Sequence, residues 1–129
     1  MQDRPQVSPG ETVVMKAIWD LGKGSVGEVF NSISGESEMD YATAQTYIRR
    51  LEAKGYIHSE RIGRNKIYRA AVKKQTVLRE AVDEFVGRMF DGELLPMVRH
   101  LVNSKSMSSN DISELKRIVE QLSEGEEQE

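Results

Sequence analysis

The sequence predicts a mainly α-helical protein with one small β-hairpin, and three observations support this prediction. A serine followed three residues later by an acidic residue, which is a helix-start signal, precedes apolar residues at three places in the 129 residues. Apolar residues then recur at helical spacing after each serine. Between the second and third of these signals, residues 56–69 alternate around a Gly-Arg-Asn turn, which predicts two paired strands.

The first two helices are predicted from capping boxes. Ser8 and Glu11 enclose Pro9, which suits the first helical turn, and Gly22 ends the apolar repeat that follows. Ser25 and Glu28 open a second, shorter helix, and residues 34–38 form a polar loop.

The third predicted helix starts at Asp40 or Tyr41 and runs to Lys54, with Gly55 as a left-handed C-terminal cap. Its apolar face contains Ala44, Ile48 and Leu51. At about 100° per residue, the opposite face contains hydroxyl and guanidinium groups. These belong to Thr46, Arg49 and Arg50, with Thr43 flanking.

The predicted hairpin has strands at 56–61 and 66–69. Gly63 permits the positive φ of the turn, and basic side chains surround it at Arg61, Arg64 and Lys66. Three helices followed by a two-stranded hairpin is the element order of a winged helix-turn-helix domain, which we assign to residues 1–72.

Residues 73–123 are predicted as a three-helix dimerisation region, and residues 124–129 as an acidic frayed tail. Three helices of this length bury little core alone, so we expect their apolar faces to meet a second copy of the chain. The residues expected at this homodimer interface are Leu78, Val82, Phe85, Val86, Met89, Leu115, Ile118 and Leu122.

Composition narrows the class of protein. No apolar run reaches the roughly 18 residues of a membrane span, so we expect no membrane insertion. The N-terminal residues lack the apolar core of a signal peptide, and cysteine is absent, which together predict a cytoplasmic protein.

Charge is distributed unevenly along the chain. The net charge is −3, but Tyr41 to Lys74 contain nine basic and two acidic residues. This segment is therefore +7 and the remainder −10. Such an excess favours a surface that binds a polyanion.

Sequence signals for enzymatic chemistry are missing. We find no glycine-rich phosphate loop, no nucleophile elbow and no zinc-protease motif. His58 and His100 lack nearby partners at metal-ligand spacing. We therefore predict that the protein is not an enzyme and needs no metal or cofactor.

The third helix is the candidate reader of double-stranded DNA, because the major groove admits one helix. Thr43 and Thr46 suit thymine methyls or hydrogen bonds, and Gln45 suits adenine. Arg50 suits either a guanine or a phosphate. Phosphate contacts are expected from Arg49, Lys54, Arg61, Arg64 and Lys66.

The stretch from Tyr41 to Ile57, YATAQTYIRRLEAKGYI, resembles the recognition helix of the penicillinase repressor (BlaI/MecI/CopY-type) family of transcriptional regulators. The segments at 14–19, 24–29 and 90–92, and the closing 107–115, are also similar to that family. Together they extend the resemblance from about Ser8 to Leu122. The resemblance implies a homodimeric repressor that binds a palindromic operator and dimerises through its C-terminal helices.

In the antibiotic-sensing branch of the family, a membrane sensor protease triggers cleavage of the repressor at an Asn-Phe bond. The resemblance therefore implies a sensor protease as a further partner. His100-Leu101 aligns with that bond here. The copper-responsive branch carries C-terminal cysteines, and this chain has none. Two other functions compatible with a winged helix are a protein-interaction module and a ligand-gated regulator.

Overall fold

The computed structural model describes residues 4–35, 37–104 and 107–127. The chain forms two compact units, Met1–Ala81 and Val82–Glu129. The division falls inside a helix, nine residues after the predicted domain boundary, because the first turns of that helix pack with the N-terminal unit. We describe each unit separately.

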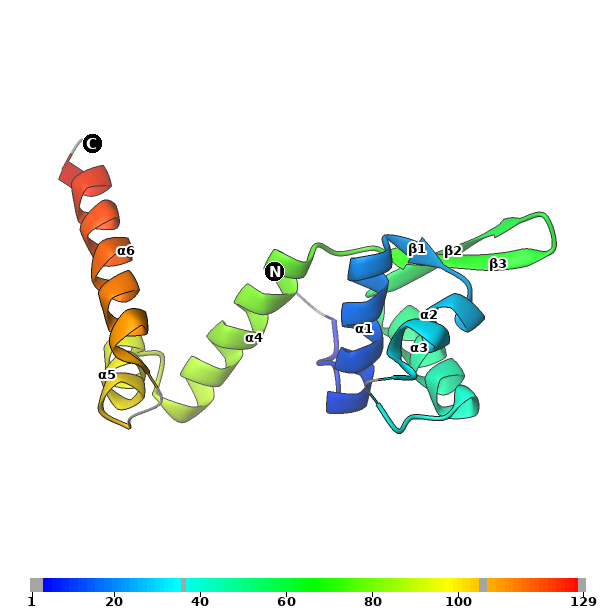
Figure 1. Ribbon diagram of the computed structural model, residues 1–129, viewed down its shortest axis with the longest axis horizontal. Helices are drawn as coiled ribbons and strands as arrows, with labels where there is room; N and C mark the ends of the chain where they lie inside the picture. The colour runs from blue at the N-terminus through cyan, green and yellow to red at the C-terminus, as the bar shows by residue number, and fades with distance from the viewer. Residues whose placement is uncertain (1–3, 36, 105–106, 128–129) are drawn as a thin grey trace. The chain divides into compact units, whose positions relative to one another are not determined.

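The first unit contains three helices and a small sheet (Figure 1). The helices are α1 (Pro9–Leu21), α2 (Val26–Ile33) and α3 (Tyr41–Lys54), and the first turns of α4 (Lys74–Met89) complete the unit. The strands are β1 (Lys23–Gly24), β2 (Ile57–Ile62) and β3 (Asn65–Ala70). This mainly helical winged-helix fold with C-terminal helices is the predicted fold class.

The predicted helix caps are confirmed. The Ser8 hydroxyl accepts from the Glu11 N–H at 3.2 Å, while the Glu11 carboxylate accepts from the Ser8 N–H at 3.0 Å. Ser25 and Glu28 repeat this arrangement at the start of α2. Asp40 caps α3 through the Thr43 N–H at 2.7 Å, a hydrogen bond that lowers the pKa of the Asp40 carboxyl.

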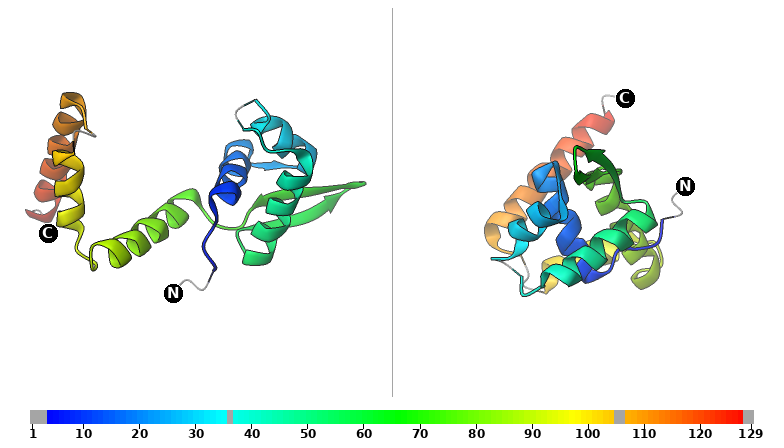
Figure 2. Two further views of the ribbon diagram at one scale, coloured as in Figure 1. Left: turned by 90° about the horizontal axis from the view of Figure 1, so that it is seen from below. Right: turned by 90° about the vertical axis from the view of Figure 1, so that its right-hand side faces the viewer.

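The sheet has the order β1-β3-β2 and is antiparallel throughout. Strand β1 was not predicted, because two residues are too short to show any periodicity. It forms where the chain turns from α1 into α2 and pairs Lys23 with Arg69 and Gly24 with Tyr68. The β2–β3 hairpin extends beyond α1, α2 and α3, as Figure 1 and the left view of Figure 2 show.

The core of the first unit lies between the three helices and the base of the sheet. Its fully buried side chains include Ile18 of α1, Val29 of α2 and Ile48 of α3. Tyr56 and Tyr68 are also buried there, while Trp19 and Tyr47 are partly buried against it. The tyrosines at 47 and 56 are thus core or rim residues.

The second unit contains the rest of α4, α5 (Leu94–Asn103) and α6 (Ser109–Glu127). Ser108 and Asp111 are the third serine–acid pair of the sequence, and they form a reciprocal cap of α6 with both hydrogen bonds at 3.1 Å. Helix α6 continues to Glu127 and so includes most of the segment expected as a frayed tail; residues 128–129 lie outside the described residues. Within the described part of this unit, Val86 is the one buried apolar side chain.

Candidate nucleic-acid interface

One face of α3 is free of the core. Ala44, Ile48 and Leu51 are fully buried, whereas Thr46, Arg49 and Arg50 are exposed, and Thr43 and Gln45 are half-buried beside them. The Thr46 hydroxyl donates to the Ala42 carbonyl at 3.0 Å. The Thr46 hydroxyl proton is therefore used within the helix. The Thr46 methyl group and the lone pairs of its hydroxyl oxygen remain available to a ligand outside the helix.

Arg50 is restrained on this face by an aromatic ring. Its guanidinium carbon lies 5.8 Å from the centre of the Tyr47 ring. Tyr47 is itself fixed against Gly10, where an added Cβ would lie 2.5 Å from the ring. A larger residue at position 10 would force the Tyr47 ring to shift, and in its present place the ring supports Arg50.

Lys54 is placed differently from the other predicted basic residues. Its ammonium donates to the Glu11 carboxylate and, at 2.8 Å, to the Gln6 carbonyl. Glu11 is 1% exposed, and Lys54 lies on the side of α3 that meets α1. Because this ammonium is already paired within the unit, the contacts of Lys54 serve the packing of α1 on α3, and its phosphate contact stays a prediction.

The electrostatics of Glu11 follow from the same contacts. Burial alone would raise the pKa of the Glu11 carboxyl, since a charge is costly away from water. The hydrogen bonds from Lys54 and from the Ser8 backbone, with the positive charges of Lys54 and Arg50, outweigh burial and hold this pKa below its ordinary value. Glu11 is therefore ionised at neutral pH.

The hairpin register brings two predicted basic residues to one side. Arg61 of β2 is paired with Lys66 of β3, and Ser59 with Tyr68. Alternate residues of a strand share a face, so Arg61 and Lys66 lie on the same face as the buried Tyr68, the face toward α3. Arg64 lies in the turn beside Gly63, whose φ is +64°.

Glu52 links this face of the hairpin to α3. One carboxylate oxygen accepts from the Ser59 hydroxyl at 2.7 Å, and the other lies 3.6 Å from the Lys66 ammonium. Lys66 also lies 5.4 Å from the centre of the Tyr68 ring. Glu52 was not identified from the sequence, because a glutamate on a polar helix face carries no signal for such a role.

Arg69 lies on the opposite face of the hairpin. Its guanidinium donates to Glu60 at 2.7 Å, and its register partners are Lys23 and His58. By contrast, Arg49, Arg61 and Arg64 form no ion pair within the described residues. The three unpaired guanidinium groups are therefore available to an anion.

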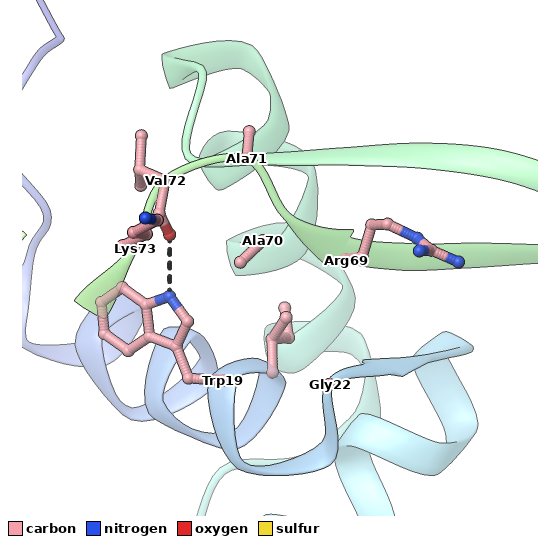
Figure 3. Close-up of a pocket in the computed structure, with 8 residues that line it drawn as sticks. Trp19, Gly22, Arg69, Ala70, Ala71, Val72 and Lys73 are labelled. Atoms are coloured by element: carbon pink, nitrogen blue, oxygen red, sulfur yellow. Dashed lines mark hydrogen bonds between the residues drawn. The ribbon is translucent and has the colours of Figure 1, made fainter. Parts of the chain in front are cut away.

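The first unit also has an open depression of about 520 Å³ between the end of α1 and the segment that leads from β3 into α4 (Figure 3). The Trp19 indole donates to the Val72 carbonyl there at 3.0 Å. Two cationic residues, Arg69 and Lys73, line it with apolar neighbours, and no lining residue is a carboxylate or histidine. Among the described residues, no cluster suited to a metal ion is found, and no helix there is long and apolar enough to cross a membrane.

Comparison with known proteins adds to this geometry. Residues 7–121 match the family model described as the penicillinase repressor. A penicillinase repressor of Bacillus licheniformis is 30% identical over 121 residues, which cover 94% of each chain. The methicillin resistance regulatory protein MecI of Staphylococcus aureus is 24% identical over 88% of this chain and 93% of its own length.

A solved structure is also similar to the first unit. It is the solution structure of the Bacillus licheniformis BlaI monomeric form in complex with the blaP half-operator. It is 32% identical, has a TM-score of 0.51, and the match covers 58% of this chain and 92% of that one.

Proposed function

This chain belongs to the penicillinase repressor family, whose members are DNA-binding transcriptional repressors and not enzymes, and on that premise we propose that it is a homodimer that represses transcription by binding a palindromic operator. One observation carries the proposal. The exposed face of α3 and the α3-facing side of the hairpin present unpaired guanidinium groups, and a related protein with the same fold binds a half-operator. The DNA of the bacterial relatives lies in the cytoplasm, so we propose that this protein is cytoplasmic as well.

We propose that base reading and phosphate binding are divided between α3 and the hairpin. Thr43, Gln45, Thr46 and Arg50 face the bases from α3. Arg49, Arg61, Arg64 and Lys66 bind phosphates on either side. In this arrangement Glu52 sets the position of the hairpin relative to α3 through Ser59 and Lys66.

The proposed dimer interface uses the apolar residues left exposed on α4 and α6. Leu78, Val82, Phe85 and Met89 form one stripe along α4 and are 42–59% exposed. Ile118 and Leu122 of α6 are exposed as well, and Leu115 is half-buried. Val86 is already buried within its own unit and is left out of the interface.

A sensor protease is not part of the proposal. The bond cleaved in the antibiotic-sensing branch aligns with His100-Leu101 here, a different residue pair on α5. The signal that releases the repressor from DNA is therefore left outside the proposed function.

A gel shift on the DNA upstream of the protein's own gene, at two salt concentrations, tests operator binding. We expect a discrete complex that survives competitor DNA, with a footprint of two half-sites about 10 bp or a small multiple apart. If four phosphate contacts form in each protomer, log K should fall with log salt with a slope of about −7. A smear that vanishes at moderate salt would instead favour a general polyanion surface and overturn the proposal.

Replacing Arg50 by alanine tests its role as a base reader. We expect Arg50→Ala to weaken operator binding by about 1–3 kcal/mol and to relax the preference at one base position of each half-site. Binding to a set of operators with single base changes measures both effects. Arg117→Ala, which removes an exposed positive charge from α6, is the control. A uniform loss over all operators would reassign Arg50 to a phosphate.

A further inference from the structure

The chain before α1 is held across the end of the recognition helix. The Tyr56 hydroxyl donates to the Pro5 carbonyl at 2.7 Å, and the Lys54 ammonium donates to the Gln6 carbonyl at 2.8 Å. Val7 packs against the core, and Ser8 caps α1. Residues 4–8, which we call the N-terminal strap, are thus fixed on the first unit at several successive positions.

Arg4 extends this strap to α4. One guanidinium nitrogen lies 3.0 Å from each carboxylate oxygen of Glu80, and the two side chains are 20% and 25% exposed. The Arg4 guanidinium carbon also lies 5.5 Å from the centre of the Tyr56 ring. Because the pair is partly buried and Arg4 is held from a second side, it is a firmer link than an exposed ion pair.

The segment that leads into α4 is anchored to the same unit. The Ala71 N–H donates to the Tyr56 carbonyl at 2.8 Å, and the Trp19 indole donates to the Val72 carbonyl, as Figure 3 shows. Val77 packs against the core one turn further on. The Arg4–Glu80 pair is the last of these anchors along the chain before the second unit begins at Val82.

Glu80 and the apolar stripe lie on opposite sides of α4. At about 100° per residue, Glu80 is about 160° from both Leu78 and Val82, which differ from each other by only about 40°. One side of the helix is therefore tied to the DNA-binding unit, while the other side carries the stripe assigned to the dimer.

We infer that Arg4 and Glu80 are a positioning pair that holds the first turns of α4 on the DNA-binding unit, and that this restraint makes the dimer prefer one spacing of the two half-sites. This inference rests on the proposed function. A dimer binds both half-sites tightly only if the second α3 reaches its groove without a further loss of conformational freedom. When the first turns of α4 are held on the DNA-binding unit, part of this conformational freedom is already lost before DNA is bound. The contact of each α3 with its own half-site does not involve Glu80.

The test measures the binding of full-length protein to three DNA duplexes derived from the footprint. They are the full operator, a single half-site, and an operator with one base pair added between the half-sites. The added pair rotates one half-site by about 34–36° about the DNA axis. The variants are Glu80→Gln and the exchange Arg4→Glu with Glu80→Arg. Glu84→Gln, which breaks an exposed ion pair on the same helix, is the matched control.

We expect Glu80→Gln to bind the full operator about three- to tenfold more weakly than the wild type, with unchanged affinity for the half-site. Its preference for the natural spacing over the lengthened operator should also shrink. The exchange variant should recover both properties, and Glu84→Gln should resemble the wild type.

Three results would overturn the inference. Glu80→Gln could match the wild type on all three duplexes, it could lose the same factor on the half-site, or the exchange variant could stay as weak as Glu80→Gln. Failure of the proposed function looks different, because the wild type itself would then bind the full operator no better than the half-site.

Discussion

Phe85→Lys is expected to convert the protein from a dimer to a monomer and to reduce operator binding to the level of a single half-site. Phe85 is 42% exposed in the middle of the α4 stripe, between Val82 and Met89. Burial of a phenylalanine side chain stabilises by about 1.5–3 kcal/mol, and a symmetric interface contains the residue twice. Two lysine charges brought into the proposed interface would also be costly to bury, so we expect the dimer dissociation constant to rise at least about 100-fold.

Sedimentation of the purified protein over a range of concentrations measures this change. Arg79→Lys, a conservative replacement at an exposed position of α4, is the control and should remain dimeric. Circular dichroism should show a loss of helix content no larger than the second unit accounts for, because the described residues of that unit bury only Val86 without a partner. A Phe85→Lys protein that still sediments as a dimer would show that the α4 stripe is not the interface.

Glu11→Gln is expected to lower the free energy of unfolding by about 1–3 kcal/mol, because Glu11 is buried while its partner Lys54 is 24% exposed. The substitution removes the negative charge that faces Lys54 and leaves the partly buried Lys54 ammonium without its ion-pair partner. It also weakens one of the two hydrogen bonds of the first capping box. Urea unfolding of both proteins at neutral pH measures the difference.

Glu28→Gln is a matched control for Glu11→Gln, because Glu28 holds the same place in the second capping box but is exposed. We expect it to cost no more than about 1 kcal/mol. If both substitutions cost the same, the Lys54 ion pair contributes nothing beyond the cap.

The pH dependence of stability gives a second measurement on Glu11. Its pKa in the folded protein is lowered from the ordinary value of 4.5, so the unfolded chain takes up the proton first as pH falls. The stabilisation by Glu11 is therefore complete at neutral pH and is lost below pH 4.5, as pH falls through the lowered pKa. Glu11→Gln should show a flatter loss of stability between about pH 5 and pH 3 than the wild type.

Local chemistry made most elements of the fold predictable. Ser8, Ser25 and Ser108 each begin a helix because a short polar side chain satisfies N–H groups that the first turn leaves free. Gly55, with φ of +89°, ends α3 as predicted, since few other residues adopt that conformation without strain. These signals depend only on neighbours in the sequence.

The exposed face of α3 was predictable for a similar reason. Helical spacing alone separates Ile48 and Leu51 from Thr46, Arg49 and Arg50, and the structure buries the first pair and exposes the other three. The core side of α3 could thus be distinguished from the candidate DNA-facing side without any knowledge of what packs against the helix.

The sequence by itself determined the order of the helices and the hairpin, the caps, the basic segment and the family. Only the tertiary structure decided which cations are free. Lys54 and Arg61 look alike in sequence, but Lys54 meets Glu11, 43 residues away, whereas Arg61 forms no ion pair within the described residues. The same holds for strand β1, for Glu52 beside Ser59 and for Arg4 beside Glu80. The physical reason is that an ion pair or a strand pairing depends on distance in space, and for contacts far apart in the chain this distance is set only when the core has packed.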